Sequence, residues 1–299
     1  MKPLEFLRPA TLAEALTTLG QAPAGTGILA GGTDLIVQWR TGSKELSRMV
    51  DIKALPELNV LEYSPATGLR LGAAVPCATL GALDEARQAY PGLVAAAELI
   101  GSTQIQSRAS VGGNVCNGSP AADTICALIV LEAVMVAQGP DGQREIPARD
   151  FMTGPGATAL QPGELLSEIR VPPLPSQGPS AEAYLRFIPR NEMDIAVAGA
   201  AVWIQLSPDK KSCTTARVAI GAVAPTPLLV EAAGAALTGA TVNDGQLDDA
   251  AVQAASQAAS AATQPITDVR GTAEFRTHLA GVLTRRVIAL ATQSALERA

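Results

Sequence analysis

Ser107-Arg-Ala-Ser-Val-Gly-Gly-Asn-Val-Cys-Asn-Gly-Ser-Pro-Ala-Ala-Asp123 is the most informative stretch of this 299-residue chain. Its glycines have no Cβ, so they let a backbone approach a ligand closely and adopt positive φ. Its serine and asparagine side chains can hydrogen-bond a polar ligand without bringing charge. The stretch leads directly into an apolar segment, residues 124–137, and Asp123 stands before it as a candidate helix cap or a ligand for hydroxyl groups.

A second glycine-rich stretch lies upstream, Gly27-Ile-Leu-Ala-Gly-Gly-Thr-Asp-Leu35. We predict a short buried strand, a turn and then a helical turn over 35–40, an order in which backbone N–H groups face an anion. The spacing matches neither the dinucleotide G-x-G-x-x-G pattern nor the P-loop, and a tight turn with an aspartate cap would look the same. Together, the two stretches predict one extended polyphosphate ligand held from two sides.

Composition narrows the class of protein. The chain is 47% hydrophobic with a net charge of −6, and it has no basic stripe, which argues against nucleic acid as a partner. The most apolar stretch, Ala121–Ala137, contains Asp123 and Glu132 and is shorter than the ~20 residues of a membrane helix, so we predict a buried helix there. Residues 1–9 do not resemble a signal peptide, which predicts a cytoplasmic protein.

Cysteine and histidine usage excludes several chemistries. Cys77, Cys116, Cys126 and Cys213 form no C-x-x-C pair, so neither an iron–sulfur nor a zinc site is expected, and no metal ligands are predicted. We expect reduced thiols, with Cys116 a small buried one. A single histidine, His278, allows neither a Ser-His-Asp triad nor a histidine metal cluster. No catalytic side chain is predicted, so any chemistry must come largely from a bound cofactor.

Hydrophobic periodicity predicts alternating helices and strands, typical of an α/β or α+β body. We expect helices over 11–20, 79–90 and 91–100, and strands over 27–30, 49–52, 69–75, 134–137, 143–147 and 165–172. The proline-rich segment 172–179 is predicted to be a linker. Beyond it we expect strands over 181–189, 195–206 and 216–223, then helices over 249–262 and 272–298, which make a compact α+β unit.

These motifs resemble those of a known family. Ala30-Gly-Gly-Thr-Asp-Leu35, Ala109-Ser-Val-Gly-Gly-Asn-Val-Cys-Asn-Gly-Ser-Pro-Ala-Ala-Asp123, Asn191-Glu-Met-Asp-Ile-Ala196 and the segment from Thr267 to Arg286 are similar to segments of the FAD-binding medium subunits of the molybdenum hydroxylases. This is the group of xanthine dehydrogenase and aerobic carbon monoxide dehydrogenase. The likeness covers essentially the whole chain.

The resemblance implies an α+β protein with the PCMH-type FAD-binding fold. Two small α/β lobes, residues 1–56 and 57–175, would clamp FAD. A C-terminal α+β domain, residues 176–299, would follow with a three-stranded antiparallel sheet and helices. Some relatives carry a cysteine-rich insertion for an iron–sulfur cluster in this subunit. This chain has no such insertion, so FAD is expected to be its only redox centre.

The resemblance also implies which residues bind FAD. Leu29, Ala30, Gly31, Gly32, Thr33, Asp34 and Leu35 would wrap the pyrophosphate, and Ser110, Val111, Gly112, Gly113 and Asn114 would reach it from the second lobe. Asn117 and Ser119 would add polar contacts, and Asp123 would bind a hydroxyl of the ribityl chain or ribose. Ile100 and Leu166 would flank the isoalloxazine ring, with Arg186 as a cation near it. Core packing or a surface charge would explain these last three equally well.

The implied function is electron transfer within a complex. A large subunit would hold the molybdopterin-type molybdenum cofactor, and a small subunit would hold two [2Fe–2S] clusters that deliver electrons to FAD here and then to an external acceptor. A dimer of such heterotrimers is expected, with no nucleic acid and no membrane span. Two other hypotheses are a freestanding FAD-dependent oxidoreductase and a flavin-free structural subunit. The intact glycine-rich turns argue against the latter.

Overall fold

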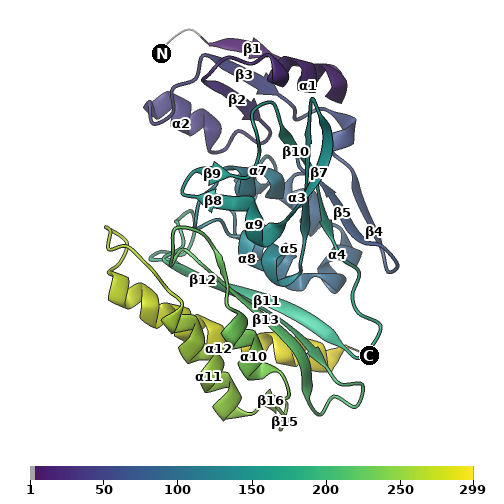
Figure 1. Ribbon diagram of the computed structural model, residues 1–299, viewed down its shortest axis with the longest axis vertical. Helices are drawn as coiled ribbons and strands as arrows, with labels where there is room; N and C mark the ends of the chain where they lie inside the picture. The colour runs from purple at the N-terminus through teal and green to yellow at the C-terminus, as the bar shows by residue number, and fades with distance from the viewer. Residues whose placement is uncertain (1–3, 299) are drawn as a thin grey trace.

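The computed structural model describes residues 4–298, and it stacks three sheets along the long axis of the molecule (Figure 1). We call the first sheet with α1 and α2 the first lobe, and the second sheet with α3–α9 the second lobe. The third sheet with α10–α12 is the C-terminal domain. Residues 1–3 and 299, at the ends of the predicted domains, lie outside the described part. No helix within residues 4–298 is long and apolar enough to cross a membrane.

The first lobe is a small parallel sheet. Its strands, in the order β1-β3-β2, are β1 (Glu5–Leu7), β2 (Thr26–Leu29) and β3 (Arg48–Asp51), accompanied by α1 (Leu12–Gly20) and α2 (Leu35–Thr41). The predicted helix over 11–20 is confirmed, and Thr11 caps it by accepting a hydrogen bond from the Glu14 backbone N–H at 3.2 Å. Strand β1 was not predicted, because three residues are too few to show alternation.

The second lobe is built on a five-stranded antiparallel sheet in the order β4-β5-β10-β6-β7. Its strands are β4 (Leu61–Ser64), β5 (Gly68–Gly72), β6 (Val134–Gly139), β7 (Gly142–Pro147) and β10 (Leu165–Val171), with a small hairpin of β8 (Met152–Gly154) and β9 (Ala157–Thr158). Its helices are a 3-10 turn (Pro56–Leu58), α3 (Cys77–Gly81), α4 (Asp84–Ala89), α5 (Pro91–Glu98), α6 (Thr103–Gln106), α7 (Val111–Cys116), α8 (Ile125–Val130) and α9 (Ala148–Phe151).

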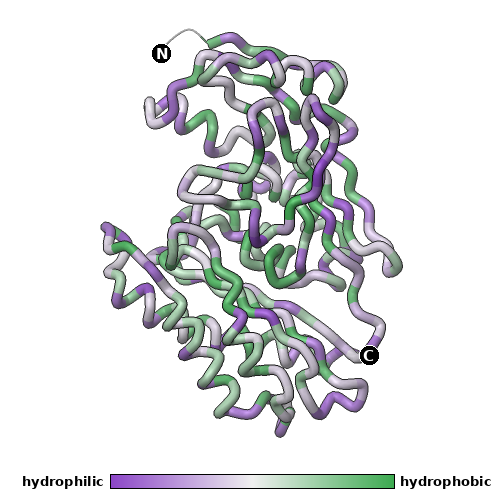
Figure 2. Tube along the Cα trace, viewed as in Figure 1, coloured by the Kyte–Doolittle hydropathy of each residue, from purple (hydrophilic) through white to green (hydrophobic). Residues whose placement is uncertain are grey.

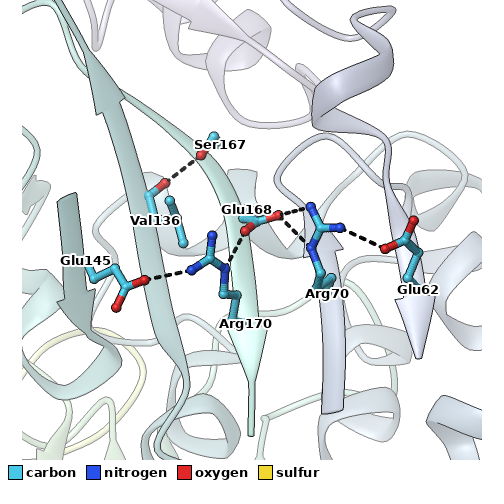
Figure 3. Close-up of polar contacts among 7 residues, drawn as sticks. All are labelled: Glu62, Arg70, Val136, Glu145, Ser167, Glu168 and Arg170. Atoms are coloured by element: carbon cyan, nitrogen blue, oxygen red, sulfur yellow. Dashed lines mark hydrogen bonds and ion pairs between the residues drawn. The ribbon is translucent and has the colours of Figure 1, made fainter. Parts of the chain in front are cut away.

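The two faces of this sheet differ in polarity. Leu69, Leu71 and Ile169 belong to the large core formed with the helices. On the other face, charged side chains from β4, β5, β10 and β7 form a ladder across the strands (Figure 3). At its centre Glu168, 9% exposed, pairs with the arginines on both sides, at 2.9 Å to Arg70. The outer pairs are exposed, so they contribute little each, whereas Glu168 needs its partners because it is buried.

Two helix predictions in this lobe were wrong in extent. The segment 121–137 is helical only over α8, because Glu132 takes a left-handed conformation (φ 55°) and the chain then enters β6. Alternating valines favour this strand, which the periodicity also indicated. The single helix expected over 79–90 is two short helices, α3 and α4.

The C-terminal domain is a sequentially ordered antiparallel sheet, β11 (Ser180–Phe187), β12 (Ala198–Leu206), β13 (Cys213–Gly221) and β14 (Leu228–Leu229). The three predicted strands are present. The two-residue edge strand β14 and α10 (Glu231–Leu237) were not foreseen, nor was the hairpin of β15 (Val242–Asn243) and β16 (Gln246–Leu247). Predicted helices correspond to α11 (Asp249–Ala261) and α12 (Ala273–Glu297). Figure 2 shows hydrophobic residues concentrated along this sheet, where a second core lies.

Small residues let α11 and α12 pack closely. A Cβ on Gly281 of α12 would lie 2.5 Å from the Ser260 hydroxyl, and Ser256 donates a hydrogen bond to the Gly281 carbonyl at 2.9 Å. At the start of α12, Arg276 is buried and donates to the Asp268 carboxylate at 2.7 Å and to the Val197 carbonyl at 2.7 Å. The C-terminal motif therefore holds this domain together.

Glu182 of β11 joins the C-terminal domain to the second lobe. Its carboxylate is buried and accepts hydrogen bonds from the first N–H groups of α5, Gly92 at 2.9 Å and Leu93 at 3.2 Å. Arg298 reinforces the same junction by donating to the Ser180 and Gln88 carbonyls. Burial raises the pKa of Glu182 to about 7, although the two N–H groups and Arg298 oppose this rise.

This raised pKa predicts that the fold loses stability as pH rises. Between pH 4.5 and 7 the folded chain keeps a proton on Glu182 that the unfolded chain releases. A rise from 4.5 to about 7 corresponds to a destabilisation of about 3 kcal/mol, fully present above pH 7. We expect Glu182→Gln to remove this part of the pH dependence, measured as denaturant unfolding midpoints between pH 5 and 8.

The exposed Glu85 of α4 provides the matched control, since Glu85→Gln removes a carboxylate that is not buried. A Glu182→Gln variant with the same pH profile as the wild type would contradict the assignment.

Candidate functional site

A cavity of about 270 Å³ lies between the first and second lobes, and we call it the interlobe cavity. This is close to the lower end of the range for small-molecule sites, so it suits part of an extended ligand. Both glycine-rich stretches contribute to its wall. The predicted site residues that line it are Ala30, Gly31, Gly32, Thr33, Asp34, Leu35, Ile100, Ser110, Gly112, Gly113, Asn114, Asn117 and Leu166.

Close backbone approach, rather than ligand contact, explains two of the glycines. A Cβ on Gly31 would lie 2.4 Å from the Arg108 carbonyl oxygen, and one on Gly112 would lie 2.4 Å from the Ala73 carbonyl oxygen. Lys53 of the first lobe strengthens the first of these junctions by donating to the Arg108 carbonyl at 3.2 Å. The approach of Gly31 to Arg108 brings the two stretches together into one wall, whereas the approach of Gly112 to Ala73 packs the second lobe internally.

Gly113 is different, because an added Cβ would meet a side-chain hydroxyl and not the backbone of another segment. Only the Ser110 hydroxyl, at 3.1 Å, would meet a Cβ at this position. The segment around it is the short helix α7 rather than the expected turn, and Ser110 caps it by accepting from the Gly113 N–H at 3.0 Å. Gly113 therefore leaves the backbone of the second lobe uncovered by a side chain where it lines the cavity.

Two asparagines from the end of α7 line the cavity, and protein donors already occupy their carbonyl oxygens. Asn114 Oδ1 accepts from the Thr124 hydroxyl at 2.8 Å and from the Thr124 N–H at 3.3 Å. Asn117 Oδ1 accepts from Gln38 Nε2 at 2.9 Å, a bond that joins α2 to the second lobe. Each amide keeps its NH₂ group for another partner.

The cavity is nearly neutral. Among the described residues of its wall, Asp34 is the only acid and Lys44 the only base. Asp34 precedes α2 without making a side-chain cap, and burial raises the pKa of its carboxyl group. Hydrophobic side chains complete the wall, namely Ile28, Ile52, Ile100, Leu160, Leu165 and Leu166. A ligand with both a polar diphosphate and an apolar ring system matches this combination.

Five predicted residues do not line the cavity: Leu29, Val111, Ser119, Asp123 and Arg186. The first two are buried in the packing of their own lobes. The Ser119 hydroxyl accepts from the Ala121 N–H at 3.2 Å. Asp123 and Arg186 form a buried ion pair at 2.7 Å, which joins the segment before α8 to β11.

Several residues of the wall were not predicted. Gln38 stands four residues after Asp34, so its place on the same helix face was a usable signal. Lys44 and Leu160 lie in loops, where periodicity gives no guide. Cys116 was expected to be a buried thiol, but it is exposed and lines the cavity, whereas Cys77, Cys126 and Cys213 are buried. No cluster of potential metal ligands occurs in the described part of the chain.

Two known protein families match successive parts of the chain. Residues 2–174 match the FAD binding domain in molybdopterin dehydrogenase, and residues 183–291 match the CO dehydrogenase flavoprotein C-terminal domain. The xanthine dehydrogenase FAD-binding subunit of Escherichia coli O157:H7 is 32% identical over 290 residues, covering 97% of this chain and 96% of that protein.

Carbon monoxide dehydrogenases are similar in both sequence and structure. The medium chain from Afipia carboxidovorans is 34% identical over 284 residues, covering 95% of each chain. A solved carbon monoxide dehydrogenase from Hydrogenophaga pseudoflava, which lacks the Mo-pyranopterin moiety of the molybdenum cofactor, has a chain that superposes with a TM-score of 0.90. That chain is 33% identical, with 98% of both chains covered.

The packing around Gly31 predicts a strong effect on stability. We expect Gly31→Ala to destabilise the fold by about 3 kcal/mol or more, because the added Cβ meets backbone atoms of Arg108 and Ala109 that must shift. Urea unfolding measures the change. Gly154→Ala is the matched control, since no atom lies within 4 Å of its added Cβ. Equal stability of the two variants would show that the lobes do not depend on this contact.

Proposed function

This chain belongs to the family of FAD-binding subunits of molybdopterin dehydrogenases, and we propose that it holds FAD in the interlobe cavity as the electron-transfer subunit of such a complex. The single observation that carries the placement is the meeting of both glycine-rich stretches in one nearly neutral cavity. The proposal keeps the predicted division into residues 1–56, 57–175 and 176–299.

The residues of the wall fit the parts of FAD. We propose that the turn at Gly31–Thr33 and the backbone at Gly113 hold the diphosphate, where neutral donors bind an anion without filling the space it needs. Ile100, Leu160 and Leu166 would pack against the isoalloxazine ring. The predicted contacts of Asp123 and Arg186 with FAD remain predictions, and they would require that the ligand extend beyond this wall.

The chain's own part in the chemistry is to bind and orient. When bound, FAD accepts electrons one at a time and can release them as a pair. The wall contains no histidine, and its one acid and one base, Asp34 and Lys44, are not joined by a hydrogen bond or ion pair in the described structure. The residues therefore fix the position of the ring and its surroundings, and they do not form an acid–base pair for an organic substrate.

We further propose the partner subunits, the electron acceptor, the assembly and the location of the complex. A small subunit with two [2Fe–2S] clusters supplies the electrons, a large subunit with the molybdenum cofactor oxidises the substrate, and an external acceptor receives the electrons. The assembly is a dimer of heterotrimers in the cytoplasm. Support comes from the relatives, whose names describe a FAD-binding subunit and a medium chain.

The first test is an absorption spectrum of the purified chain. We expect absorption bands at ~370 and ~450 nm, which are a property of the flavin itself. Gly113→Ala should fold but bind FAD about tenfold more weakly, because its Cβ would add bulk to the cavity wall and press on the Ser110 hydroxyl that caps α7. Gly154→Ala is again the control. A wild-type chain that cannot bind FAD would favour the flavin-free structural subunit.

The second test concerns the cavity thiol. The surroundings of Cys116 raise the pKa of its thiol to about 12, so the alkylation is run at alkaline pH. We expect Cys116 to react with a small alkylating reagent in the FAD-free chain and to be protected when FAD is bound, because it lines the cavity. Mass spectrometry of labelled peptides measures both states, and the buried Cys77 should stay unlabelled in each. Equal labelling of Cys116 with and without FAD would place the cofactor elsewhere.

The third test separates a subunit from a freestanding enzyme. We expect iron–sulfur and molybdenum subunits to co-purify with the chain, and the isolated chain not to oxidise an organic substrate. Substrate oxidation by the chain without partners would instead support the freestanding oxidoreductase.

A further inference from the structure

Asn114 is held in one orientation by a residue that does not touch the cavity. Thr124, fully buried, donates both its backbone N–H and its hydroxyl to Asn114 Oδ1. A backbone N–H can only donate, so the atom that faces Thr124 must be the amide oxygen. The amide nitrogen of Asn114 is therefore the group that this residue can offer to the cavity it lines.

The neighbouring polar groups have the same character. Asn117, three residues later, also has its carbonyl oxygen occupied, by Gln38 Nε2. Lys44 adds a cation to the wall. The amide nitrogens of Asn114 and Asn117 and the Lys44 ammonium are hydrogen-bond donors in this wall, so the ligand atoms that meet them must be acceptors.

We infer that Thr124 is a positioning residue that fixes Asn114 as a hydrogen-bond donor to a diphosphate oxygen of the bound dinucleotide. This inference rests on the proposed function, and it adds that the protein donates and the ligand accepts the hydrogen bond at Asn114. Diphosphate oxygens are the favoured acceptors because Asn114 directly follows Gly113, whose backbone lines the same cavity without a side chain. Charge makes these oxygens stronger acceptors than a ring carbonyl.

Asn114→Asp is the decisive variant. Aspartate keeps the oxygen that Thr124 needs, so the local fold is retained, but it replaces the donor with a charged acceptor. We expect FAD affinity to fall by about 100-fold or more, because a charge-assisted hydrogen bond is lost and two anions are brought together. Asn114→Ala loses only the donor and should weaken binding by about tenfold.

The order of these two variants distinguishes ligand contact from a structural role. If Asn114 served only to receive Thr124, aspartate would be the milder change. The inference requires instead that Asn114→Asp bind FAD more weakly than Asn114→Ala, and that Asn114→Asp have the higher unfolding midpoint of the two variants. The reverse order in FAD affinity would overturn the inference.

Thr124 is tested by its own pair of variants. Thr124→Val removes the hydroxyl with little change of shape and should weaken FAD binding by about fivefold, whereas Thr124→Ser should restore it. Equal affinities of the Val and Ser variants would overturn the positioning role.

ADP identifies the half of the dinucleotide that is involved. Calorimetry on the full chain should show Asn114→Asp weakening ADP and FAD by similar factors. An effect on FAD without one on ADP would overturn the diphosphate assignment. If the wild-type chain binds neither FAD nor ADP, the proposed function itself fails. If the wild-type chain binds both and Asn114→Asp binds them equally well, only the inference about Asn114 and Thr124 fails.

Discussion

The close approach of two backbones at Gly31 is the constraint on which the site depends. The β2–α2 turn of the first lobe lies so near the Arg108 carbonyl that any side chain would push the lobes apart. The same carbonyl accepts from Lys53, so two independent contacts of the first lobe converge on one atom of the second. The interlobe cavity lies beside this junction, with Gly31, Gly112 and Gly113 in its wall.

A neutral wall suits an anionic ligand that must also carry a large apolar ring. Neutral donors contribute hydrogen bonds to phosphate without the cost of burying several unpaired charges in the unliganded protein. The one acid in the wall, Asp34, already has a raised pKa because it is partly buried. The same cavity also has an apolar side, with Ile100 and Leu166.

Much of this arrangement could be predicted from sequence because its signals are local. Thr11 marked the start of α1, and the prolines at 172–179 marked a segment that has no regular structure between the β10 and β11 strands. Both glycine-rich stretches line the interlobe cavity, but the packing that requires a glycine at position 31 was not foreseen, since the closest neighbours of Gly31 are about 80 residues away in sequence. The pairing of Asp123 with Arg186 and the place of Lys44 in the wall depend on similar long-range packing, which a single sequence does not reveal.

The C-terminal domain takes part in the site through the segment between α7 and α8. Thr124 holds Asn114 at the cavity, and its neighbour in the chain, Asp123, is anchored by Arg186 of β11. A continuous path of short contacts therefore runs from the C-terminal sheet to the cavity wall. Glu182 holds the same sheet against α5, and Arg298 links Ser180 of β11 to the Gln88 carbonyl of α4, so the sheet cannot shift without breaking these hydrogen bonds. Within residues 4–298, the third domain therefore contributes no residue to the cavity wall but supports, through Asp123, the segment that carries Thr124.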